Sequence, residues 1–113
     1  MERNRLEEAG IDYAGALGRF VGKRELYERF LMKFVADTHA VEADRAFAEH
    51  NYAKMLEQTH ALKGVAGTLG LLQMHKLAAE IVDDLRAGEH AALGERMRAL
   101  MEENDRLHTL LRE

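Results

Sequence analysis

Eleven residues in the middle of the chain combine a nucleophilic side chain, a cation and several glycines. They run from His60 to Gly70 and read His-Ala-Leu-Lys-Gly-Val-Ala-Gly-Thr-Leu-Gly. In a helix, at about 100° per residue, Lys63, Gly64 and Gly67 lie within roughly 60° of His60 around the axis. The apolar side chains of the same stretch cluster on the opposite side, where a core would be. The imidazole is therefore expected to face solvent beside an ammonium group. A neutral imidazole has a free nitrogen lone pair, so it can attack phosphorus and form a phosphoramidate.

The two glycines that share the His60 face need an explanation, because a glycine inside a helix costs about 1 kcal/mol relative to alanine. Gly64 and Gly67 lie on the His60 face and not on the Leu62 face. The favoured interpretation is that a partner must bring its backbone close to the histidine. The alternative is that the glycines permit close contact between helices of one bundle.

The segment resembles the signature of the histidine-containing phosphotransfer (HPt) domain family. That signature is His-x-Leu-Lys-Gly, then a pair of small residues, a glycine, and a second glycine three residues later. The matching positions here are His60, Leu62, Lys63, Gly64, Ala66, Gly67 and Gly70. Other stretches also look like the family, so the resemblance covers nearly the whole chain: Gly10-Ile11-Asp12, Glu25-Leu26-Tyr27 with Phe30 and Phe34, Leu77 to Glu80, and Leu85 to Gly88. The chain departs from the pattern at Asn51, where the family more often has Asp, and at Val65, where a small residue is usual.

The resemblance implies a function in a two-component phosphorelay. His60 would accept a phosphoryl group from the aspartate of one response-regulator receiver domain and pass it to another receiver. Lys63, one turn further on, would orient and partly neutralise the phosphoryl oxygens. The chain would be a phosphocarrier and not an enzyme. We expect no cofactor and no metal site in it, because the Mg²⁺ of the reaction belongs to the receiver. Its partners would be receiver domains, a hybrid histidine kinase, or both.

A docking surface is expected around the histidine. Gly64 and Gly67 would form its smooth centre. Leu56 and Ala53 fall within about 40° of His60 on the same helix, so they would extend the surface. Leu17, Phe20 and Val21, from an earlier helix, are further candidates, with core packing as the alternative for each.

Composition limits the other possibilities. A chain of 113 residues is large enough for one core, so we expect a single domain over residues 1–113, with residues 1–10 as a loose lead-in. The absence of cysteine excludes disulfides. No apolar run approaches the roughly 20 residues that span a membrane. The formal charge of −4, without a basic block, argues against nucleic acid as a partner. We expect a monomeric cytoplasmic protein, either free-standing or part of a larger kinase.

Hydrophobic periodicity and capping residues predict an all-helical fold. Helices are expected at about residues 12–21, 23–37, 41–49, 51–70, 72–87 and 89–111, with Asp12 and Asn51 as N-caps and Gly22, Gly70 and Gly88 as stops. The four long ones should form an antiparallel four-helix bundle. The helix at 12–21 would cap one end, and the helix at 41–49 would link the second long helix to the histidine helix.

Other functions match parts of this sequence less well or equally well. The phosphoryl-accepting domain of a chemotaxis-type histidine kinase has nearly the same motif, so it stays open. A di-metal carboxylate bundle would use Glu57-x-x-His60, but it needs a second such motif, and Asp105-x-x-His108 only approximates one. A purely structural adaptor would leave the glycines beside an exposed histidine unexplained. The remaining histidines, at 39, 50, 75, 90 and 108, are expected to be ordinary surface residues.

Overall fold

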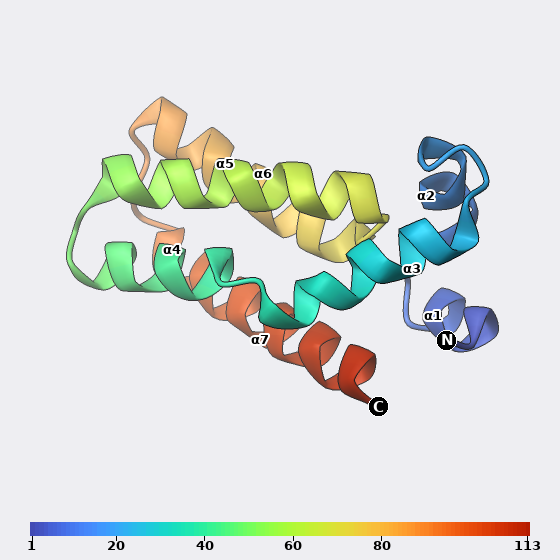
Figure 1. Cartoon of the computed structure of the whole chain (residues 1–113). Helices are drawn as coiled ribbons and strands as arrows, with labels where there is room; N and C mark the ends of the chain where they lie inside the picture. The colour runs from blue at the N-terminus through green and yellow to red at the C-terminus, as the bar shows by residue number, and fades with distance from the viewer.

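The amphipathic segments fold as helices in the computed structural model, which describes all residues 1–113 (Figure 1). The elements are α1 (Arg3–Glu8), α2 (Tyr13–Arg19), α3 (Arg24–Lys33), a 3₁₀ turn η1 (Phe34–Ala36), α4 (His39–Ala48), α5 (Tyr52–Leu69), α6 (Leu72–Ala87) and α7 (Leu93–Arg112). None of these helices is both long and apolar enough to cross a membrane.

The long helices form the antiparallel bundle that the sequence predicts. In Figure 1, α3, η1 and α4 follow one another beneath α5 and together make the first wall of the bundle. Helix α5 packs most extensively against α4 on one side and α6 on the other, and α7 packs against α6, α4 and η1. The histidine helix α5 therefore has neighbours on two flanks and leaves a third side free.

Local signals explain where α5 begins and ends. The side chain of Asn51 accepts a hydrogen bond from the backbone N–H of Lys54 at 3.1 Å, which satisfies one of the free donors of the first turn. Gly70 ends the helix in the left-handed conformation, at φ 75°. Such a φ favours glycine because it has no Cβ. Both features were predicted from the sequence and are confirmed.

The inner faces of the bundle meet in one apolar core. Fully buried side chains come from every long element, among them Leu31, Phe34, Met55, Leu62, Met74, Ile81, Met97 and Leu100. Thr59 is also buried, and its hydroxyl donates to the Met55 carbonyl oxygen at 2.9 Å. The inward side of α5 is therefore fixed by packing, which fixes the outward direction of His60.

The N-terminal segment differs from the expected loose lead-in. Residues 3–8 form α1, and Leu6 is buried at 4% exposure in the common core. Helix α2 caps one end of the bundle, as predicted. The Asp12 N–H donates to the Gly70 carbonyl oxygen at 2.8 Å, and Ile11 pairs with Leu71 in an isolated β-bridge. The chain before α3 is thus attached to the turn that ends the histidine helix.

Two other boundaries differ from the prediction. The helix expected over 23–37 ends at Lys33 and continues as η1, because Asp37 breaks it by accepting a hydrogen bond from the N–H of His39 at 2.9 Å. Helix α4 then starts at His39 and forms a wall of the bundle as well as a link to α5. The last helix starts at Leu93, later than the predicted residue 89, because residues 89–92 first form a turn in which the Leu93 N–H donates to the His90 carbonyl oxygen at 3.2 Å.

Candidate functional site

The outward side of α5 presents a narrow strip of small side chains around one histidine. His60, Ala53 and Gly64 are exposed, and Gly67 is half-buried. The opposite side of the same helix carries the buried residues Met55, Thr59, Leu62, Ala66 and Leu69. The strip is therefore the part of α5 that a second protein can reach.

The imidazole of His60 is free of contacts that would tie up its nitrogens. Among the histidine rings of the chain, only that of His39 makes a hydrogen bond within the molecule, to Asp37. The ring of the exposed His60 therefore has no hydrogen-bond partner within the chain, and in its neutral form one nitrogen lone pair is available for nucleophilic attack. Glu57 is exposed on the same side, and no group of three or more potential metal ligands comes together in the structure. The inward-facing glutamate and histidine set of a di-metal bundle is thus not assembled.

Lys63 lies one helical turn from His60 and is half-buried. Residues three apart on a helix surface are neighbours, about 5–6 Å between Cβ atoms. Its side chain forms no ion pair with a carboxylate of the chain. A free ammonium group within reach of His60 can meet an incoming anion.

The two glycines of the strip differ in their surroundings. A Cβ added to Gly64 would meet no atom within 4 Å, so this position is open space beside the histidine. A Cβ added to Gly67 would lie 3.3 Å from Cδ2 and 3.7 Å from Nε2 of His75, on α6. The expectation that both glycines keep the surface smooth for a partner therefore needs a correction at Gly67. There, the alternative of close contact between helices applies.

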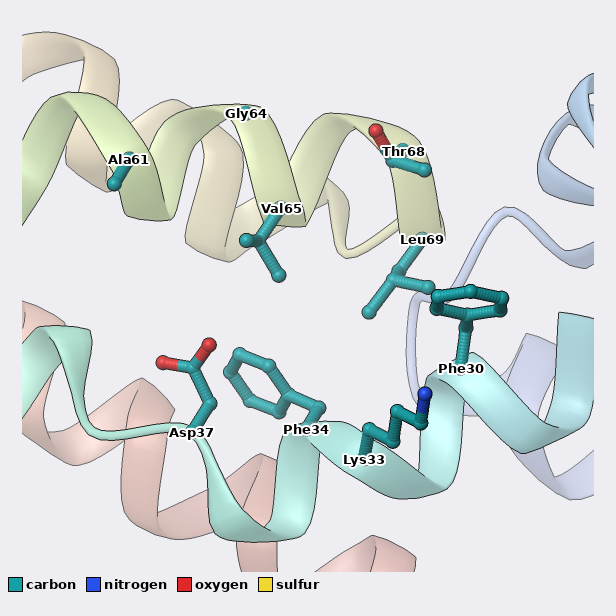
Figure 2. Close-up of a pocket in the computed structure, with 9 residues that line it drawn as sticks. All are labelled: Phe30, Lys33, Phe34, Asp37, Ala61, Gly64, Val65, Thr68 and Leu69. Atoms are coloured by element: carbon teal, nitrogen blue, oxygen red, sulfur yellow. The ribbon is translucent and has the colours of Figure 1, made fainter.

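A groove of about 510 Å³ runs along the other flank of the strip, between α5 and the α3–η1 segment (Figure 2). Figure 2 shows Ala61, Gly64 and Val65 on the α5 side, facing Phe34 and Asp37 on the other. The remaining lining residues are Phe30, Lys33, Thr68 and Leu69. Because Gly64 borders both the groove and the His60 strip, the two form one continuous surface.

The groove carries one ammonium group and one carboxylate group among its apolar walls. The Lys33 ammonium lies 4.6 Å from the centroid of the Phe30 ring, a cation–π contact. Asp37 is engaged at the start of α4, where its Oδ2 lies 2.9 Å from Nδ1 of His39. Lys33 is therefore the charge in the groove that is available to a ligand or partner.

The candidate docking residues outside the strip fall into two groups. Val21 is 82% exposed, at φ 55°, on the turn after α2. Leu17 and Phe20 are half-buried and pack against the core. The Phe20 ring also lies 5.6 Å from that of Phe30, so it borders the groove region from α2. On α5, Leu56 is half-buried, at the flank of the strip.

Several hydrogen bonds hold the C-terminal end of α5 in place. Tyr27 is fully buried, and its hydroxyl donates to the Leu69 carbonyl oxygen at 2.8 Å. Burial raises the pKa of Tyr27, so it remains a donor throughout the neutral range. Arg19 donates to the Thr68 carbonyl oxygen at 3.1 Å. These bonds satisfy carbonyl groups that the helix itself leaves free, and they fix the strip relative to α2 and α3.

His108 differs from the surface histidine that the sequence predicted. It is half-buried on α7, its ring packs edge-on against that of Phe34 at 5.1 Å, and its Nε2 is buried without a hydrogen-bond partner. Burial lowers the pKa of His108, with a smaller contribution from Arg112. Phe34 lines the groove and His108 does not, so His108 contacts the groove wall through the Phe34 ring.

Two features of this surface were missed in the sequence. Phe30 belongs to the apolar stripe of its helix, yet it is 42% exposed. A helical wheel could not reveal this, because the exposure depends on the gap between α3 and α5. The contact of His75 with Gly67 joins two helices and likewise has no local signal.

A comparison with protein families gives one match. The family model described as Hpt domain matches residues 25–111, which include all of α4, α5 and α6 and most of α3 and α7. No curated protein matches the chain, and no solved structure matches it.

Proposed function

The chain belongs to the Hpt domain family, whose members carry phosphoryl groups on histidine in phosphorelay signalling, and from this premise we propose that His60 is the phosphoryl-accepting residue. Domains of this family are phosphocarriers and not enzymes. The proposal is specific about the donor and the acceptor. The phosphoryl group comes from an aspartyl phosphate of one receiver domain and goes to the aspartate of another.

The chemistry needs only one nucleophile from this chain. A ring nitrogen of neutral His60 attacks phosphorus, the phosphorus–oxygen bond to the receiver aspartate breaks, and that carboxylate leaves. A phosphorus–nitrogen bond is formed on His60, and the reverse reaction on a second receiver regenerates the free imidazole. Such transfers depend mainly on positioning and charge stabilisation. The free, outward-facing ring of His60 supports the first requirement.

Charge stabilisation is divided between the two proteins in this proposal. Lys63 contributes one ammonium group beside the phosphoryl oxygens. A partly exposed ion pair of this kind is worth about 0–1 kcal/mol, so Lys63 assists and does not drive the reaction. The receiver would supply Mg²⁺ and the rest of the charge stabilisation. No metal ligand is assigned to this chain.

The receiver would dock on the continuous surface made by the His60 strip and the groove. The strip contributes Ala53, Leu56 and Gly64, where the chain leaves room for an approaching backbone. The groove contributes Phe30 and Val65. Leu17, Phe20 and Val21 would extend the surface on α2, and Gly67 would contribute through its neighbour His75.

The observation that carries the proposal is the open space beside an exposed, unpaired histidine. The test is transfer of a radioactive phosphoryl group from receiver domains of the source genome, each labelled separately, to the protein and to its His60→Gln variant. We expect label on the wild type that is lost in mild acid, as a phosphoramidate requires, and no label on the variant. Label on both proteins would exclude His60 as the acceptor.

The same assay separates the two origins of the phosphoryl group. If no receiver labels the protein but a chemotaxis-type kinase domain with ATP does, the chain is the phosphoryl-accepting part of such a kinase. If neither labels it, the phosphotransfer proposal is wrong.

A further inference from the structure

A second histidine shares the surface around His60. His75, on α6, is half-buried, and its ring lies against Gly67, with Cδ2 3.3 Å and Nε2 3.7 Å from the place where a Cβ would be. The 3.3 Å distance to Cδ2 is slightly shorter than an ordinary Cβ contact, so an alanine at position 67 would require the imidazole to shift by a few tenths of an ångström. Glycine at position 67 therefore leaves room for the ring of His75.

His75 lies inside the area that a docked receiver must cover. Gly67 follows His60 by seven residues, which places it about 10 Å along the helix axis. A stable interface buries about 800 Å² on each partner, equal to a disc of about 16 Å radius. Because the partner's reacting group must reach His60, this disc is centred close to the strip. His75 then falls within it, on the α6 flank opposite the groove.

Docking would change the hydrogen bonding of the His75 ring. Neither ring nitrogen bonds to another group of the chain, since His39 is the one histidine with such a bond. In the free protein, water can reach the half-buried ring. Under a receiver, that water is displaced unless the partner supplies a replacement. A buried polar group left without a partner weakens association, by about tenfold or more.

We propose that His75 is a specificity-determining residue, which favours receivers that present a hydrogen-bonding group to its ring, and that Gly67 acts by leaving room for this ring. The proposal rests on the function proposed above, because the partner is the receiver that exchanges a phosphoryl group with His60. In this proposal Gly67 affects receiver docking indirectly, through the position of the His75 ring, whereas Gly64 affects it directly by leaving space for the receiver.

The test compares rates of phosphoryl transfer at increasing receiver concentration. Receiver domains of the source genome are phosphorylated with acetyl phosphate and Mg²⁺, and the best receiver for the wild type is used with several poor ones. The variants are His75→Phe, His75→Ala, Gly67→Ala and the double variant Gly67→Ala with His75→Ala. Lys76→Ala, which alters the exposed neighbour of His75 on α6, is the matched control. Circular dichroism establishes that each variant is folded.

For the best receiver, we expect His75→Phe to raise the half-saturating concentration about tenfold and to leave the maximal rate unchanged. The poor receivers should be affected less, so the preference among receivers narrows. Gly67→Ala should also raise the half-saturating concentration of the best receiver. It should have no further effect when His75 is already alanine, because the two residues act as one unit.

Two results would overturn the proposal while leaving His60 as the acceptor. One is a His75→Phe variant that behaves like the Lys76→Ala control with every receiver. The other is a double variant in which the two effects simply add, which would show that Gly67 contacts the partner directly. If no receiver labels the wild type, the proposed function fails, and this inference fails with it.

Discussion

Gly64 offers a substitution that should stabilise the protein and impair its function. Gly64 lies in the interior of α5, it is exposed, and a Cβ there would meet no atom within 4 Å. Alanine is better than glycine in a helix interior by about 0.5–1 kcal/mol, because it loses less backbone entropy on folding. Nothing in the structure opposes this gain, so we expect Gly64→Ala to raise the free energy of unfolding by that amount.

The functional effect should have the opposite sign. Gly64 stands four residues from His60 on the same side of α5, so any side chain there projects into the space that an approaching receiver would fill. We expect a few-fold slower transfer for Gly64→Ala and at least tenfold slower transfer for Gly64→Gln. Glutamine has a helix propensity close to that of alanine, so its effect would come from bulk and not from unfolding.

Urea unfolding followed by circular dichroism measures the first effect, and single-turnover transfer of label measures the second. Gly94 supplies the matched control. It is exposed on α7, and a Cβ there would make only an ordinary contact, 3.8 Å from Cζ of Phe47. Gly94→Ala and Gly94→Gln should leave transfer unchanged. The reasoning is refuted if Gly64→Gln transfers as fast as the wild type, or if Gly64→Ala destabilises the fold.

Substitutions at four further positions test other parts of the structure. Lys63→Ala should slow transfer by no more than about fivefold and Lys63→Arg should retain most of the rate, since the interaction is worth about 0–1 kcal/mol; a loss of a thousandfold would give Lys63 a larger role. In urea unfolding, Gly88→Ala should destabilise the protein by about 1–2 kcal/mol from its left-handed φ of 69° alone. Gly70→Ala should cost about 1–3 kcal/mol more, because the added Cβ would lie 2.6 Å from the Asp12 carbonyl oxygen; equal losses would contradict the close approach of α2. Burial lowers the pKa of His108 in the folded protein, so the unfolded chain binds a proton more readily at this residue. The free energy of unfolding should therefore be unaffected by His108 above about pH 6.5 and should decrease as the pH falls below that value. His108→Leu should remove this part of the pH dependence and the unpartnered Nε2, so an unchanged stability–pH curve would argue against the buried environment.

Much of the fold could be predicted because its signals are local. Asn51 and Gly70 mark the ends of α5 by capping chemistry, and the buried stripe through Leu62 fixes which side of that helix faces inward. The outward direction of His60 follows from the stripe alone. The resemblance of the His60 motif to the family signature then indicates the function.

Other features depend on how helices are placed relative to one another, and the sequence pattern does not contain that information. On a helical wheel Gly64 and Gly67 are about 60° apart, both close to His60. Only the position of α6 distinguishes them, because it brings His75 against Gly67 and leaves Gly64 open. The exposure of Phe30 has the same origin, since it results from the gap between α3 and α5.

The break in the first wall of the bundle was also missed for a physical reason. The apolar stripe from Leu26 to Val35 suggests a continuous helix to residue 37. Instead, Asp37 accepts a hydrogen bond from the N–H of His39 and ends the run, a competition between side chain and backbone that periodicity does not register.

If His60 carries the phosphoryl group, that group can be located directly in the wild-type protein. The protein is incubated with a phosphorylated receiver, digested at neutral to alkaline pH, and mapped by tandem mass spectrometry. We expect a single modified residue, His60, and loss of the modification after mild acid. A phosphoryl group found on His75 or any other residue while His60 remains unmodified would contradict it.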